Sequence, residues 1–165
     1  MVAGPWGRCM SDVSIETARL PHPALPSADW ADCYAVTTRN HDATALDLAR
    51  KMFGRSPRWV GLLLSLRNRI VGLFGLKSAE LGIAEGERIG AFPVVSARDD
   101  QVVLGFDDSH LNFRIVWHVT AAGSQAWRLA VTTLVDRHNL FGRIYIFVIT
   151  PFHKLIVRTL LVRMR

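Results

Sequence analysis

Residues 107–119 read DDSHLNFRIVWHV, and the alternation of apolar and polar side chains in this stretch decides the fold. In an extended chain, successive side chains point to opposite sides of a sheet. One side of this stretch carries Leu111, Phe113, Ile115, Trp117 and Val119, and the other carries His110, Asn112, Arg114 and His118. The pattern predicts a half-buried strand from about residue 110 to residue 120. We expect its apolar side to face the core, because burial of each large apolar side chain contributes roughly 1.5–3 kcal/mol.

Further strands are predicted on either side of this one. Residues 88–97, 101–106 and 126–135 have strand character, and short turns such as Arg98-Asp99-Asp100 separate them. Turns this short connect antiparallel neighbours, so the middle of the chain is predicted to form a meander. Residues 30–38 alternate loosely, and an earlier strand is expected at residues 33–38.

Two short helices are predicted after the first strand. Asp42 or Thr44 can cap a helix that runs to Phe53, and Ser56-Pro57 opens a second helix that runs to about Phe74. We expect the polar side of the strand at 110–120 to be either solvated or covered by these two helices. Residues 1–28, which contain the proline-rich PHPALPS, are predicted to form an irregular arm, and residues 29–165 a single domain.

The chain after Asn139 is predicted to be one long helix, with Pro151 inside it as the expected site of a bend. At 100° per residue, one broad arc contains Ile144, Tyr145, Val148, Ile149, Phe152, Leu155, Ile156 and Leu160. We expect this arc to pack on the sheet. A membrane span needs about 20 mostly apolar residues, whereas Arg143 and Lys154 bracket only residues 144–153, so no transmembrane helix is predicted.

Composition and charge narrow the class of protein. The chain has 165 residues, a formal net charge of +6 and two cysteines, too few for a disulfide framework. No signal peptide is recognised, and a cytoplasmic location is expected. Residues 48–79 and the chain after Asp136 contain basic side chains and no acid. Such segments are typical of solvated helix faces, or of surfaces that attract anionic partners.

Four segments carry a resemblance to a known family: PRWVGLLLSLRNRIVGLFGLK (57–77), GERIGAFPV (86–94), DDSHLNFRIVWHV (107–119) and HNLFGRIYIFVITPFHKLIVR (138–158). The resemblance covers the chain from about Asp29 to Arg163. The sequence resembles a bacterial domain-of-unknown-function family, number 2867, near the polyketide-cyclase, START and plant-allergen-like (SRPBCC) superfamily. The resemblance implies the helix-grip fold, an α+β fold in which a curved antiparallel sheet wraps around a long C-terminal helix. It also implies an apolar cavity but no established activity, and Asn112 stands where an acid is expected.

Catalytic candidates are few. His110 and His138 could act as general bases, because histidine titrates near neutrality, and Asp108 could orient one of them. His110 and His118 are too far apart along one strand, roughly 26 Å at ~3.3 Å per residue, to share a metal ion. No metal site and no cofactor are predicted.

Three functions remain open. The first is binding of a small hydrophobic or amphipathic ligand in a cavity lined by Phe113, Ile115, Trp117, Leu129, Val131, Tyr145, Val148 and Phe152, with Arg114 and Arg143 as polar candidates. The second is a cyclase- or hydratase-like reaction that uses His110 or His138. The third is contact with lipid or a membrane surface through the basic helices. Nucleic-acid binding is not expected, since no recognised module is present, and the sequence does not give the oligomeric state.

Overall fold

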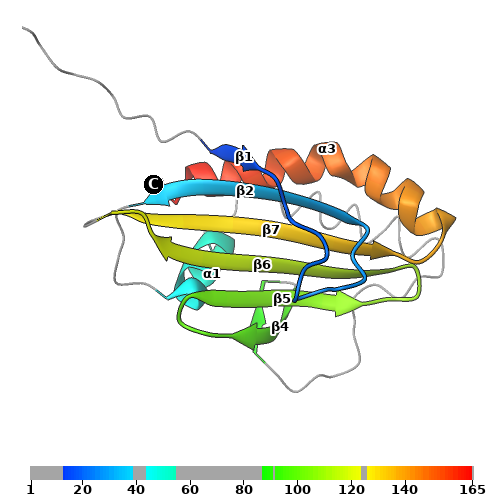
Figure 1. Cartoon of the computed structure of the whole chain (residues 1–165), viewed down its shortest axis with the longest axis horizontal. Coiled ribbons are helices and arrows are strands. Elements are labelled where there is room, and N and C mark those ends of the chain that lie inside the picture. Colours follow the sequence, from blue (N-terminus) through cyan, green and yellow to red (C-terminus); the bar gives the residue numbers. More distant parts are fainter. Residues whose placement is uncertain (1–12, 39–43, 55–86, 91, 124–125, 165) are drawn as a thin grey trace, which may run out of the picture.

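One curved antiparallel sheet and a long helix along it dominate the molecule (Figure 1). The computed structural model describes residues 13–38, 44–54, 87–90, 92–123 and 126–164. Within these residues the strands are β1 (Ser14–Glu16), β2 (Trp30–Thr38), β3 (Arg88–Ile89), β4 (Phe92–Ala97), β5 (Gln101–Asp107), β6 (Leu111–Ala121) and β7 (Trp127–Arg137), and the helices are α1 (Ala45–Gly54) and α3 (Leu140–Val162). The strands are ordered β1-β2-β7-β6-β5-β4-β3 across the sheet.

The α+β architecture and the meander predicted from the sequence are confirmed. The segment predicted as one strand at 88–97 is instead interrupted at Gly90, whose φ of +60° is a left-handed conformation that favours glycine, and β3 and β4 pair across this turn. Part of the predicted irregular arm forms β1, which pairs with β2. The helix predicted at 56–74 lies outside the described residues.

The inner face of the sheet, defined here as the face that carries α1 and α3, holds the main core. Ile115 and Trp117 of β6 are buried there with Val157 and Leu161 of α3. The apolar side of β6 therefore faces the helix, as its alternation predicts. α3 packs on β2 and β7, whereas α1 packs on β5 and β6 (Figure 1).

The opposite face of the sheet is covered differently from the expectation. Val116 and Leu134 on this outer face are buried against Leu25 and Ala28 of the N-terminal segment. α1 lies on the inner face with α3, so of the two alternatives predicted for the polar side of β6, solvent or the early helices, coverage by α1 is wrong. The physical reason is that Leu48 and Met52 of α1 bury their side chains in the larger apolar cluster on the inner face.

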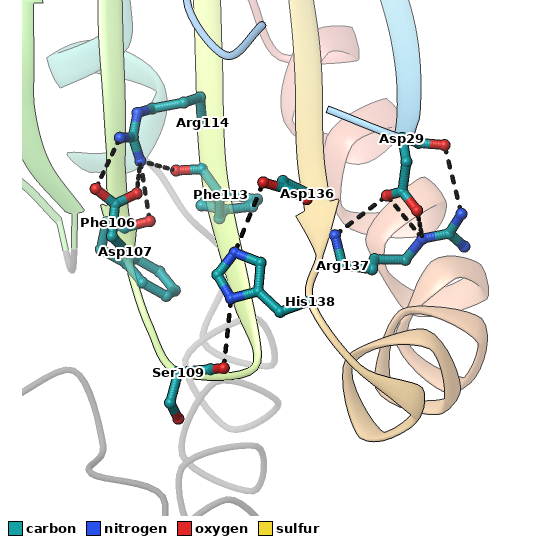
Figure 2. A network of polar contacts seen from close by, with 9 residues as sticks. All are labelled: Asp29, Phe106, Asp107, Ser109, Phe113, Arg114, Asp136, Arg137 and His138. Atoms are coloured by element: carbon teal, nitrogen blue, oxygen red, sulfur yellow. Dashed lines mark hydrogen bonds and ion pairs between the residues drawn. The ribbon is translucent and has the colours of Figure 1, made fainter. Parts of the chain in front are cut away.

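Arg114 of β6 lies across the neighbouring strand on the outer face (Figure 2). Its guanidinium donates hydrogen bonds to the carbonyl oxygens of Phe106 (3.0 Å) and Phe113 (2.9 Å) and pairs with Asp107. Gly105 makes room for it, because a Cβ there would lie 2.7 Å from Cδ of Arg114 and 2.2 Å from the carbonyl oxygen of Phe113. Arg114 is therefore a satisfied structural residue of the outer face.

The helix α3 presents an unexpected side to the sheet. Its N-cap is Asn139, whose side-chain oxygen accepts a hydrogen bond from the N–H of Gly142 (3.0 Å). Its buried residues are Gly142, Ile146, Val157, Leu160 and Leu161. Val148 and Phe152, which were expected on the sheet, are 54 % and 46 % exposed. The predicted arc is thus wrong for these two residues and for Ile144 and Leu155, which are also exposed.

Apolar residues occur on most sides of α3, so hydrophobicity alone does not select the side that packs. At the start of the helix, the close approach of the α3 backbone to the turn before β6 selects this side. A Cβ at Gly142 would lie 2.3 Å from the carbonyl oxygen of His110, at the turn before β6. Only glycine lets α3 begin this close to the sheet.

Replacement of Gly142 by alanine should therefore be costly. We expect Gly142→Ala to lower the free energy of unfolding by about 2 kcal/mol, because the clash is with backbone rather than with a flexible side chain. The matched control is Gly54→Ala at the end of α1, where an added Cβ meets nothing within 4 Å; it should change stability by less than about 1 kcal/mol. Urea denaturation of both variants measures the difference, and equal stabilities would contradict the close approach of α3.

Candidate functional site

Three polar side chains meet between α3 and the inner face of the sheet. Nε2 of His153 lies 3.2 Å from Oδ1 of Asp32 and 3.1 Å from Oγ1 of Thr133. The Thr133 residue is buried at 2 % exposure, and the side chains of Asp32 and His153 are 11 % and 18 % exposed. We refer to these residues as the Asp32–Thr133–His153 cluster.

Strand register brings the first two residues together. Asp32 of β2 and Thr133 of β7 are direct partners across the antiparallel pair. Both point to the inner face, since Tyr34 and Val131, each two residues away, belong to the core on that face. His153 comes from α3, on the side of the helix that also carries Ile146 and Val157.

One acceptor of the cluster has no partner in the part of the chain that the structure describes. With an ionised Asp32, the Nε2–H of His153 donates to Oδ1, and the Thr133 hydroxyl lies within hydrogen-bonding distance of the same nitrogen. Oδ2 of Asp32 is buried and has no hydrogen-bond partner among the described residues. A buried carboxylate oxygen that lacks a donor costs free energy, so this atom favours any group that brings an O–H or N–H to it.

The negative charge of Asp32 also affects its surroundings. Tyr34 lies two residues along the same face of β2, and its side chain is almost completely buried. Burial raises the pKa of Tyr34, and the nearby Asp32 carboxylate raises it further. The phenol is therefore held neutral beside the carboxylate well above neutral pH.

Aromatic side chains adjoin the cluster. The rings of Trp30 and His153 meet edge to face, with centroids 6.2 Å apart. Trp30 pairs with Val135, Val135 pairs with Phe113, and Phe113 pairs with Phe106, so a row of side chains crosses four strands next to the row that holds Asp32 and Thr133. The aromatic shelf, as we define it, consists of Trp30, Phe92, Phe106, Phe113 and Tyr145.

The aromatic rings of the shelf contact one another, but several of them remain partly exposed. Phe92 contacts Phe113 at a centroid distance of 5.6 Å and stacks on Phe106 at 6.5 Å. Trp30, Phe92, Phe113 and Tyr145 are only partly buried. Partly exposed aromatic rings beside a polar cluster are the composition of a small-molecule site.

The residues predicted to bind a ligand do not all lie together. Phe113 and Tyr145 belong to the aromatic shelf, whereas Ile115, Trp117, Leu129 and Val131 are buried in the main core next to it. Val148 and Phe152 are exposed on the opposite side of α3, and Arg143 is exposed as well. Arg114 lies on the outer face. A ligand-binding role for any of them stays a prediction.

The catalytic candidates lie at the junction of β6, β7 and α3. His110 is 2 % exposed and packs edge to face against Phe141 and Tyr145, with Nδ1 3.5 Å from Oδ2 of Asp108. His138 lies with Nδ1 3.3 Å from the carbonyl oxygen of Ser109 and Nε2 3.6 Å from Asp136 (Figure 2). These contacts tie the start of α3 to the β5–β6 turn. A catalytic role for either histidine stays a prediction.

Comparison with known proteins places the chain in a family. A family model described as "Protein of unknown function (DUF2867)" matches residues 24–160. The chain belongs to this family. No curated protein and no solved structure matches the sequence. The DUF2867 domain of this chain thus includes β2 to β7, most of α3, and all three members of the polar cluster.

Sequence reasoning missed the Asp32–Thr133–His153 cluster. A signal was available, because Asp32 shares a strand face with Tyr34 and Val36, and His153 stands in an otherwise apolar stretch of α3. Polar residues on apolar faces indicate a partner on the facing element. The strand order and the rotation of α3 were needed to identify that partner. In the part of the chain that the structure describes, no group of three or more His, Cys, Asp and Glu side chains could hold a metal ion.

The cluster should show energetic coupling. In a double-mutant cycle of Asp32→Ala and His153→Ala, we expect a coupling free energy of about 1–2 kcal/mol, since the hydrogen bond is largely shielded from water. The control cycle uses Asp100→Ala and His118→Ala, an exposed pair 3.9 Å apart, which should couple by less than about 0.5 kcal/mol. Chemical denaturation of the unmodified protein and the six variants gives both values. Equal coupling in the two cycles would show that the cluster is no stronger than a surface pair.

Proposed function

We propose that this DUF2867 protein binds a small amphipathic molecule between the inner face of the sheet and the part of α3 that ends at His153. The aromatic shelf would receive the apolar part of the ligand, and the Asp32–Thr133–His153 cluster would receive its polar end. The proposal includes kinship with helix-grip proteins, which is supported by the order of elements: a strand, a helix, an antiparallel meander and a long C-terminal helix.

The observation that carries the proposal is Oδ2 of Asp32, which has no hydrogen-bond partner among the described residues. This buried oxygen lies in the same carboxylate that accepts from His153, and the partly exposed Trp30 ring contacts that histidine. A hydrogen-bond donor would remove the desolvation penalty of the oxygen. A second carboxylate would add a like charge beside it. The chemistry therefore favours a ligand with a hydroxyl or an amine over one with a carboxylate.

The apolar part of the ligand is expected to contact Phe113 and Trp30. Both rings lie in the row next to Asp32 and Thr133, and both keep some exposed surface. Aromatic side chains provide large apolar contact areas, and offset or edge-to-face contacts add to them. Beyond Ile115 the core is filled by Trp117 and α1. A ligand with a short apolar chain is therefore favoured over one with a long chain.

Thermal denaturation with three matched amphiphiles tests the proposal. Octan-1-ol and octylamine, each below its aggregation concentration, should raise Tm, and octanoate should not. At a concentration about a hundred times Kd, one bound ligand stabilises by roughly 2.7 kcal/mol, which corresponds to about 5–10 °C for a domain of this size. Native mass spectrometry of the same samples should show one bound molecule.

Two variants locate the site. Phe113→Leu should weaken the stabilisation by the alcohol several-fold, because it removes part of the shelf. Phe152→Leu changes the same residue type on the exposed side of α3 and should leave ligand binding unaltered. Stabilisation by octanoate equal to that by octan-1-ol, or equal loss in both variants, would refute this site.

A further inference from the structure

The outward side of α3 carries a continuous stripe of large apolar side chains. The α3 stripe consists of Leu140, Ile144, Phe147, Val148, Phe152, Leu155 and Val162. Phe147 is 81 % exposed and Leu140 is 71 % exposed. The spacings of three, four and seven residues place these side chains along one face of the helix. This face lies opposite the one that carries Ile146 and His153.

The stripe is not explained by the core. The helix is long and apolar enough to cross a membrane by length and composition alone, yet only 22 % of its most apolar window is buried. A core helix would bury most of such a window. Soluble proteins rarely expose large contiguous apolar patches, and those that do use them for binding.

Basic side chains accompany the stripe. Arg143, Lys154 and Arg158 are exposed on α3. By helical spacing, Arg143 and Lys154 lie along one edge of the stripe, and Arg158 lies between that edge and its middle. Within the described part of the chain, none of the three forms an ion pair with a carboxylate. The sequence contains no aspartate or glutamate after Asp136. The partner of this surface must therefore tolerate apolar contact and carry negative charge.

We propose that α3 lies flat in the interface of an anionic membrane. The stripe would enter the boundary between headgroups and acyl chains, and the basic side chains would reach the lipid phosphates and carboxylates. An interfacial helix combines such an apolar face with a cationic one. This site is separate from the proposed ligand site, which lies on the other side of the same helix.

The packing of α3 against the sheet prevents lipid from surrounding the helix on all sides. Its inward side is held by the approach of Gly142 to the backbone of residue 110 and by the hydrogen bonds of His153 to Asp32 and Thr133. A spanning helix would have to leave these contacts. The sheet thus restricts α3 to one exposed side, which suits a surface helix.

Charge favours lipid over a second copy of the chain. Two α3 helices that packed stripe to stripe would bring together two helices that have no acidic side chain and three exposed cations each, and this repulsion opposes a dimer. Anionic lipid neutralises the same cations. Burial of the stripe in the membrane then supplies the apolar contribution.

Vesicle co-sedimentation of the full-length protein is the direct test. Vesicles of phosphatidylcholine with roughly 30 % phosphatidylserine should bind the protein at least tenfold more tightly than vesicles of phosphatidylcholine alone. Binding should weaken several-fold as ionic strength rises from about 0.05 to 0.5 M, because the basic contacts are screened.

Variants separate the two contributions. Phe147→Glu should reduce binding at least tenfold without lowering Tm, since this side chain makes little contact with the fold. Ile15→Glu, at a residue of β1 that is 69 % exposed, is the matched control and should bind like the unmodified protein. The double substitution Arg143→Gln and Lys154→Gln should abolish the preference for phosphatidylserine while the residual binding to phosphatidylcholine persists.

Three results would overturn the proposal. One is vesicle binding that is absent, or that is indifferent to phosphatidylserine and salt. Another is a dimer in sedimentation velocity without lipid that Phe147→Glu dissociates, which would assign the stripe to self-association. The third is protein that stays with vesicles after an alkaline carbonate wash, which would indicate a spanning helix. The first two results do not bear on octan-1-ol binding, and the ligand site is tested separately in samples without vesicles.

Discussion

The rotation of α3 about its own axis is the constraint on which the rest of the structure depends. Two residues with small or polar side chains set it: Gly142, which approaches the backbone before β6, and His153, which hydrogen bonds to β2 and β7. They lie eleven residues apart, three turns of helix, and therefore on the same side. Any other rotation would drive a Cβ into the turn before β6 and leave Asp32 without its donor.

This rotation places a polar side chain on the inward side of α3 and apolar side chains on its outward side, which is unusual for a surface helix. The inward side of α3 includes a hydrogen-bonded histidine, and the outward side includes phenylalanine, leucine and valine. In an ordinary surface helix the exposed side is the polar one. Large exposed apolar patches mark interaction sites, and the proposal of a membrane contact rests on this stripe. The inward polar cluster and the outward apolar stripe are thus two consequences of one packing choice, and they lead to two separate binding proposals.

Much of the fold was predictable because β-strand alternation is a strong signal. The segment DDSHLNFRIVWHV shows its inward side directly, and β5, β6 and β7 lie within two residues of their predicted bounds. Helix orientation was not predictable in the same way, since α3 is apolar on most sides and a count of hydrophobic residues selects no unique face. The polar cluster escaped prediction for a related reason: Asp32 and Thr133 become neighbours only through the pairing of β2 with β7, about 100 residues apart in sequence. His110 and His138 were predicted as titratable groups near turns, whereas His153, whose Nε2 contacts both Asp32 and Thr133, lies in the middle of a helix.

Thiol reactivity at two adjacent positions of α3 tests this rotation most directly. Ile146→Cys and Phe147→Cys would be made separately in a chain that also carries Cys9→Ser and Cys33→Ala, and their rates of maleimide labelling compared. The account predicts that the thiol at position 147 reacts as fast as in the unfolded chain. The thiol at position 146 should react at least about a hundredfold more slowly, because labelling there requires local opening. Equal rates, or faster labelling at position 146, would contradict the rotation of α3 and with it the separation of the polar cluster from the stripe.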